Sequence, residues 1–142
     1  MPSGASYARR DAVRLASLVF FLDRQIGTRS AAAALRAAGA CVEVHDDHFA
    51  QATPDTEWIP AVAAKEWVAI TRDKNIRRNP LERRAYEQAK LRGFVVTAQG
   101  LKGAEIAALL VKALPGMVRR SAGRQGPLLF TISASGVFTK LI

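Results

Sequence analysis

Carboxylates follow three short, mostly apolar runs of this chain, each within two residues of the end of the run. The runs are 19–22, 42–45 and 68–71, and the carboxylates after them are Asp23, the pair Asp46 and Asp47, and Asp73. If the runs are parallel strands of one sheet, their carboxyl ends share an edge, where open α/β sheets bind ligands. Carboxylate oxygens are natural ligands for Mg²⁺. The spacing therefore predicts a divalent-metal site at that edge.

Such a site could hydrolyse a phosphodiester bond. That reaction needs charge stabilisation on the phosphate oxygens and an activated water, and one or two Mg²⁺ or Mn²⁺ ions supply both. Asp23 is the first candidate ligand because it ends a strand that is apolar on both faces; its alternative role is to cap the segment that follows. Asp73 is the second candidate, with a turn-forming role as its alternative. In a sheet of order 2-1-3-4 these two acids are neighbours.

Three further acids are candidate ligands. Asp55 and Glu57 fall in the first turn of a predicted helix, where the helix dipole alone also favours acids. Asp47 follows the predicted outer strand, so it either reaches the site or belongs to a solvated turn. Trp58 and Trp67, by contrast, lie in apolar patterns and are expected in the core.

The charge distribution points to a polyanionic partner. The chain has 21 Lys and Arg against 12 Asp and Glu, a net charge of +9, and segment 72–92 alone has eight bases against three acids. Basic surfaces bind nucleic acid through phosphate neutralisation and counterion release. A merely solubilising charge excess and a partner protein with an acidic arm are the alternatives. The residues expected to hold RNA beside Asp73 are Arg72, Lys74, Arg77 and Arg78.

Strand and helix patterns alternate along the chain, which predicts an α/β fold with helices on both faces of a parallel sheet. Strands are expected at 17–22, 41–45, 67–71 and 94–97, and helices at 28–38, 53–66, 80–92 and 104–114. Thr53 is expected to cap the second helix, Asn79 with Glu82 the third, and Pro115 to end the fourth. Residues 128–132 and 137–141 suggest a C-terminal hairpin.

Length and composition predict one domain over residues 1–142, with a loose N-terminal end at 1–14 and a C-terminal extension at 121–142. No apolar run is long enough to span a membrane, and no secretory leader is recognisable. The single Cys41 excludes an internal disulfide, so a cytoplasmic location is expected. Cys41, His45 and His48 lack a partner set for zinc, and Cys41 is expected to be a buried thiol.

Five motifs in this order resemble the PIN-like ribonuclease toxins of VapC type, a compact branch of bacterial toxin–antitoxin systems. They are Phe21-Leu22-Asp23-Arg24, Ala38-Gly39, Asp46-Asp47-His48-Phe49, Pro54-Asp55-Thr56-Glu57-Trp58, and the segment from Thr71 to Glu82 that begins Thr-Arg-Asp-Lys. The resemblance covers about residues 17–115. It implies a Mg²⁺-dependent endoribonuclease on a three-layer α/β/α fold, with a mostly parallel sheet of four to five strands and a cognate antitoxin.

Carried over residue by residue, the resemblance makes Asp23, Asp73 and Asp55 the metal ligands, with Glu57 as a rival to Asp55. Family members often have a further acid after the next strand, where this chain has 97–99, Thr-Ala-Gln. Asp47 could substitute for it. The missing acid leaves open an alternative from another class, a non-catalytic module that binds nucleic acid or protein on the same fold. A homodimer is also left open.

Overall fold

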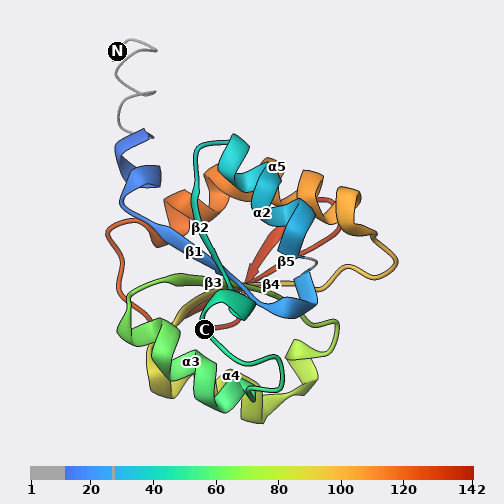
Figure 1. Cartoon of the computed structure of the whole chain (residues 1–142). Helices are drawn as coiled ribbons and strands as arrows, with labels where there is room; N and C mark the ends of the chain where they lie inside the picture. Colours follow the sequence, from blue (N-terminus) through green and yellow to red (C-terminus); the bar gives the residue numbers. More distant parts are fainter. Residues whose placement is uncertain (1–11, 27) are drawn as a thin grey trace.

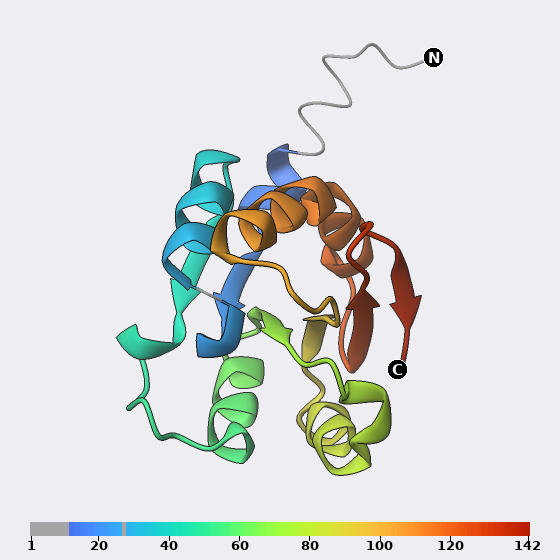
Figure 2. The same ribbon diagram turned by 90° about the vertical axis from the view of Figure 1, so that its right-hand side faces the viewer.

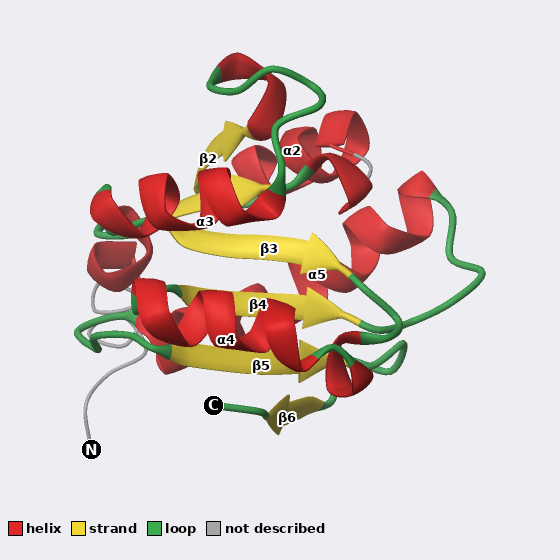
Figure 3. Ribbon diagram, turned by 90° about the horizontal axis from the view of Figure 1, so that it is seen from below, coloured by secondary structure: helices red, strands yellow, loops and turns green. Residues whose placement is uncertain are grey.

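Six strands form one sheet in the order β2-β1-β3-β4-β5-β6 in the computed structural model, which describes residues 12–26 and 28–142. The first five strands run parallel, and β6 is antiparallel to β5 at one edge (Figure 3). The bounds are Val19–Leu22 for β1, Cys41–Val44 for β2, Val68–Arg72 for β3, Arg92–Val96 for β4, Leu128–Ile132 for β5 and Phe138–Lys140 for β6. The predicted α/β class and the order 2-1-3-4 are confirmed.

Helices cover both faces of the sheet, so the fold has the three α/β/α layers that were expected. Helices α2 and α5 lie on one face, and α3 and α4 lie on the other (Figures 1 and 2). Their bounds are Thr28–Ala37 for α2, Asp55–Ala64 for α3, Pro80–Ala89 for α4 and Gly103–Ser121 for α5; short 3-10 helices are η1 (Arg24–Ile26), η2 (His45–Asp47) and η3 (Ile76–Arg78).

Strand β1 lies inside the sheet and is buried on both sides. Phe20 and Leu22 pack in the core beneath α2 and α5, whereas Phe21 packs in the core beneath α3 and α4. Trp58 is in that second core, as expected, and Trp67 packs at its border, where its ring stacks on Phe21. Because β1 is packed on both faces, the position of its carboxyl end, where Asp23 follows, is fixed.

Three predicted helix boundaries are wrong, and one is confirmed. Helix α4 ends at Ala89 and not at 92, where β4 already begins. Asn79 caps α4 by accepting a hydrogen bond from the Glu82 backbone N–H at 3.3 Å, as expected. Helix α3, however, is preceded by Pro54 and not by a Thr53 cap. Helix α5 continues past Pro115 to Ser121, because the buried residues on either side of the proline favour the helix more than the lost hydrogen bond opposes it.

The prediction for the C-terminal end can be compared with the structure, whereas the prediction for the N-terminal end can be compared only in part. Most of the predicted loose end lies outside the described residues, although residues 12–16 are helical. The C-terminal hairpin is present, and both of its strands join the sheet, which therefore exceeds the expected four to five strands. Among the described residues, no helix combines the length and the apolar character needed to span a membrane.

Candidate metal centre

Asp23 is held rigidly where β1 ends. Its backbone N–H donates to the carbonyl of Ile70 on β3 at 3.0 Å, which extends the parallel ladder by one residue. Its carboxylate accepts hydrogen bonds from the Thr71 hydroxyl at 2.8 Å and from the Arg24 backbone N–H at 2.7 Å. The side chain is only 6% exposed, and burial raises its pKa, opposed by the Thr71 hydrogen bond and reinforced by the negative charge of Asp55.

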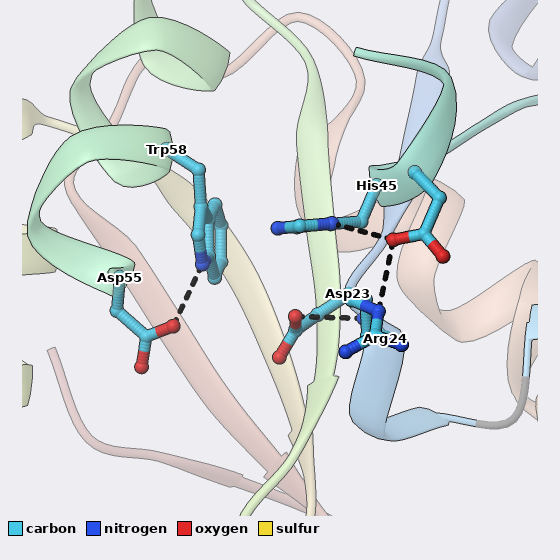
Figure 4. Close-up of polar contacts among 6 residues, drawn as sticks. Asp23, Arg24, His45, Asp55 and Trp58 are labelled. Carbon is cyan, nitrogen blue, oxygen red and sulfur yellow. Dashed lines mark hydrogen bonds and ion pairs between the residues drawn. The ribbon is translucent and has the colours of Figure 1, made fainter. Parts of the chain in front are cut away.

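Asp55 approaches Asp23 from the first turn of α3. Its Oδ1 accepts a 2.7 Å hydrogen bond from the indole N–H of the buried Trp58, which fixes the direction of the carboxylate. In Figure 4 the carboxylates of Asp23 and Asp55 point into the same space between β1 and α3. The helix N-terminus favours an acid at this position, so the dipole role considered from the sequence is compatible with the site.

Asp73 lies beside Asp23 at the same edge of the sheet, which we call the carboxyl edge because β1 to β5 end there. Its backbone N–H donates to the carbonyl of Val96 on β4 at 3.1 Å. Its Oδ1 accepts from the Asn75 backbone N–H at 2.8 Å, so Asp73 also forms the turn that was its alternative role. The side chain is half-buried and keeps its second oxygen for another partner.

Glu82, which the sequence suggested only as part of a helix cap, belongs to the same group of acids. Its pKa is raised to about 8, first by burial and then by the negative charges of Asp55 and Asp73 and by hydrogen bonding with both carboxyl groups. Asn79 also donates from Nδ2 to Glu82 Oε2 at 3.0 Å. Asp23, Asp55, Asp73 and Glu82 together form what we call the acid cluster.

The topology contains the signal that would have identified Glu82. A helix that follows a parallel strand starts at the carboxyl edge, and acids in its first turn lie there. Both Asp55 at the start of α3 and Glu82 at the start of α4 meet this condition, although Asp55 was proposed from its motif and its place in a first helical turn. The Asn-Pro start signal was interpreted as a cap alone, so the second role of Glu82 was missed.

Tyr86 on α4 lies near the acid cluster, because the charges of all four acids act on it. It lies one turn after Glu82 and is fully buried, and its hydroxyl has no hydrogen-bond partner among residues 12–26 and 28–142. Burial raises its pKa well above the usual value, and the charges of Glu82, Asp23, Asp55 and Asp73 add to the effect. The phenol therefore stays protonated.

The donor chemistry of the acid cluster fits a hard divalent cation. Four carboxylates from β1, α3, the end of β3 and α4 offer oxygen ligands only, and their excess of buried negative charge is the condition that a cation relieves. In the part of the chain that is described, no three His, Cys, Asp or Glu side chains are grouped tightly enough to form a ready ligand set. The acids are nevertheless neighbours, since the charge of Asp55 acts on Asp23 and the charges of Asp55 and Asp73 act on Glu82.

Glu57 and Asp47 are not brought to the acid cluster. Both are exposed, and neither is among the charges that act on Asp23 or Glu82. Asp46, which precedes Asp47, has other partners. Its pKa is lowered by a hydrogen bond from His45 at 3.0 Å and by an ion pair with Arg24 at 2.9 Å (Figure 4).

Cys41 is exposed, so the expectation of a buried thiol is wrong. It starts β2, which is the edge strand of the sheet, and its side chain faces away from the core that its neighbour Val42 joins.

Two of the four predicted RNA-binding bases reach from the segment around Asp73 toward β4 and β5. The Arg72 guanidinium donates to the Ala98 carbonyl at 3.3 Å, and the Arg77 guanidinium donates to the Thr131 hydroxyl at 3.4 Å. Lys74 and Arg78 are exposed. The carboxyl edge thus has acids at its centre and bases along one flank.

Fold and site together define a class of protein. The PIN like domain family matches residues 18–98, which include every member of the acid cluster, and the chain belongs to this family. One relative, from Mycobacterium tuberculosis, is named "Putative ribonuclease VapC45"; it is 31% identical over 121 residues, covering 82% of this chain and 87% of the relative. No solved structure matches the chain significantly. The resemblance inferred from the motifs is confirmed.

Proposed function

We propose that this protein is a metal-dependent endoribonuclease. The observation that carries the proposal is the convergence of Asp23, Asp55, Asp73 and Glu82 at the carboxyl edge of a PIN-family sheet. The name of the mycobacterial relative, which includes the word ribonuclease, supports the same activity.

In this proposal the acid cluster holds Mg²⁺ or Mn²⁺. When bound, such an ion stabilises charge on the phosphate oxygens and makes a water nucleophilic near neutral pH. Thr71 and Trp58 orient Asp23 and Asp55 through their hydrogen bonds. Glu82 supplies a fourth carboxylate from α4, in a chain that has none in the segment 97–99 where many family members have theirs.

The basic flank of Arg72, Lys74, Arg77 and Arg78 would hold the RNA backbone as it crosses the acid cluster. The bases neutralise phosphates without reading sequence, so they supply affinity and orientation. Positive charge beside an acidic centre also keeps the polyanion from being repelled by the carboxylates.

We further propose that the protein is the toxin of a bacterial toxin–antitoxin pair and acts in the cytoplasm. The VapC name of the relative supports the pairing, and the net charge of +9 suits an antitoxin with an acidic segment. Expression of this chain without an antitoxin should arrest bacterial growth, and expression of the Asp23→Asn variant should not.

A cleavage assay tests the enzymatic proposal. Purified protein is incubated with single-stranded RNA and Mg²⁺, with and without EDTA, beside Asp23→Asn, Asp73→Asn and Glu82→Gln. We expect metal-dependent cleavage that falls at least about 100-fold in each variant. Glu57→Gln is the matched control. Glu57 is an exposed acid in the first turn of α3, like Asp55, and this variant should cleave normally. RNA binding without cleavage, or cleavage unchanged in Asp23→Asn and Asp73→Asn, would favour the non-catalytic binding module instead.

A further inference from the structure

A cleft of about 450 Å³ adjoins the acid cluster on the side of α2 and α5. Its walls come from three segments that meet at the carboxyl edge: η1 after β1, the turn after β3 and the loop after β4. Asp73 belongs to both the cleft and the acid cluster. The polar residues that line the cleft are Gln25, Arg72, Asp73, Lys74, Asn75 and Gln99, and we call it the amide cleft.

The size and charge of the amide cleft suit one nucleotide. Pockets for small organic ligands measure roughly 300–1,000 Å³, and this volume is near the lower end, as a single nucleotide requires. Arg72 and Lys74 are cations, whereas Asp73 is the single acid in the lining and points toward the acid cluster as well. A nucleotide phosphate could therefore lie against the cations while its neighbour reaches the acids.

The amides give the cleft a capacity for recognition that the basic flank lacks. Each glutamine amide offers donors and an acceptor, the combination that reads the edge of a nucleobase or a 2′-hydroxyl. Gln25 is two residues from Asp23, and Gln99 lies in the loop where other members of the family have an acid. The hydrogen bond from Arg72 to the Ala98 carbonyl ties the β3 turn to that loop and so fixes the width of the cleft.

We propose that the amide cleft binds the nucleotide next to the cleaved bond, and that Gln25 and Gln99 select its base. The inference rests on the proposed ribonuclease function and adds to it a source of sequence preference. Among residues 12–26 and 28–142 no aromatic side chain lines the cleft, so we attribute recognition to hydrogen bonds and not to stacking.

The larger hollow of this protein does not compete for this role. About 570 Å³ in volume, it lies at the amino ends of the strands, far from the acid cluster. Its central cation, Arg92, donates to the carbonyls of Glu66 at 2.6 Å, Ser121 at 2.8 Å and Arg124 at 3.2 Å. Those three bonds hold the ends of neighbouring segments together, so this arginine is structural.

Sequencing of cleavage products tests the proposal. The unaltered protein, Gln25→Ala, Gln99→Ala and the double variant each digest a randomised single-stranded RNA with Mg²⁺, and the bases flanking each cut are counted. We expect the unaltered protein to prefer particular bases at one flanking position, and the double variant to lose roughly tenfold of that preference. Gln88→Ala is the matched control, an exposed glutamine in the last turn of α4 that should leave the preference unchanged. Melting curves verify that each variant is folded.

Two results would overturn the proposal. One is cleavage by the unaltered protein with no base preference beside the cut; the other is a preference that survives in the double variant. If neither the unaltered protein nor any variant cleaves RNA, the proposed ribonuclease function is refuted. A binding measurement then tests whether the amide cleft is a nucleotide site. Short homopolymers of each base are titrated into the unaltered protein and the double variant. Base-dependent affinity lost in the double variant supports the cleft as a nucleotide site, and equal affinities for all four bases refute it.

Discussion

The hydroxyl of Thr71 on β3 donates a 2.8 Å hydrogen bond to the carboxylate of Asp23 at the end of β1, and both residues are buried. The bond spans two adjacent strands and opposes the rise in the Asp23 pKa that burial causes. It therefore favours the ionised form of a buried acid and fixes its orientation, and both effects suit a metal ligand.

Thr71→Val should weaken the metal centre without disrupting the strand. Valine keeps the shape and the β-propensity of threonine but leaves one Asp23 oxygen without its donor, so the Asp23 pKa should rise further. We expect roughly 10- to 100-fold more Mg²⁺ to be needed for half-maximal cleavage, together with a loss of about 2 kcal/mol in the free energy of unfolding. Metal titrations of cleavage and denaturant unfolding measure the two effects. Thr71→Ser keeps a hydroxyl and serves as the control; a serine variant as weak as valine would contradict this account.

Tyr86→Phe should have opposite effects on the metal-free and metal-bound protein. The Tyr86 hydroxyl is buried without a partner in the described part of the chain, and a buried unpaired polar group costs free energy. Its removal should stabilise the metal-free protein by about 1 kcal/mol, or about 3 °C in Tm. The same change removes a buried donor on which the charges of Glu82 and Asp23 act, so affinity for Mn²⁺ should fall. Calorimetric melting with and without Mn²⁺ measures both, and destabilisation in both conditions would show that the hydroxyl is already satisfied.

The central part of the fold could be predicted from the sequence because its pattern is local. The run 19–22 is apolar at every position, so it had to be a strand covered on both faces, and Asp23 then had to emerge at the carboxyl edge. Helix ends were harder to predict. At Pro115 the local preference for a stop is outweighed by buried neighbours such as Met117, and that packing cannot be read from the residues alone.

The acid cluster was only partly predictable for a related reason. Asp23, Asp55 and Asp73 were identified because each follows a strand or starts a helix in a recognisable motif. Glu82 sits nine residues after Asp73, and its approach to the cluster depends on how η3 turns the chain before α4. Glu57 was proposed as a rival to Asp55 because both lie in the first turn of α3, but two residues along a helix turn a side chain to a different face.

The salt dependence of RNA binding should reveal the basic flank. In the double variant Arg77→Ala with Arg78→Ala, two cations beside Asp73 are removed while the acid cluster is kept intact. We expect RNA affinity to fall roughly tenfold at low salt and much less at high salt, because counterion release contributes less as the salt concentration rises. Fluorescence anisotropy across a salt series measures it. Arg119→Ala with Arg124→Ala is the control, since these residues lie away from the carboxyl edge; an equal loss there would mean that the effect is one of net charge.

The ionisation of Glu82 should make metal-free stability fall with rising pH. Its pKa is raised to about 8 in the folded protein from an ordinary 4.5, so the folded state binds a proton more tightly than the unfolded chain. The resulting stabilisation is complete below pH 4.5 and is lost as the pH rises through about 8. Because the side chain is only half-buried, solvent screening limits the effect between pH 6 and pH 9 to about 1 kcal/mol, or about 3 °C in Tm.

Comparison with Glu82→Gln isolates this contribution from every other titrating group. Glutamine resembles the protonated acid and cannot ionise, so its Tm should fall less than that of the unaltered protein between pH 6 and pH 9. Glu57→Gln should behave like the unaltered protein, because that carboxylate is exposed. With saturating Mg²⁺, the Tm of the unaltered protein and the Tm of Glu82→Gln should change equally with pH. A bound cation then replaces the proton as the partner of the carboxylate. Parallel slopes for the two proteins without metal would mean that Glu82 is already ionised at pH 6 and that the acids lie too far apart to share one ion.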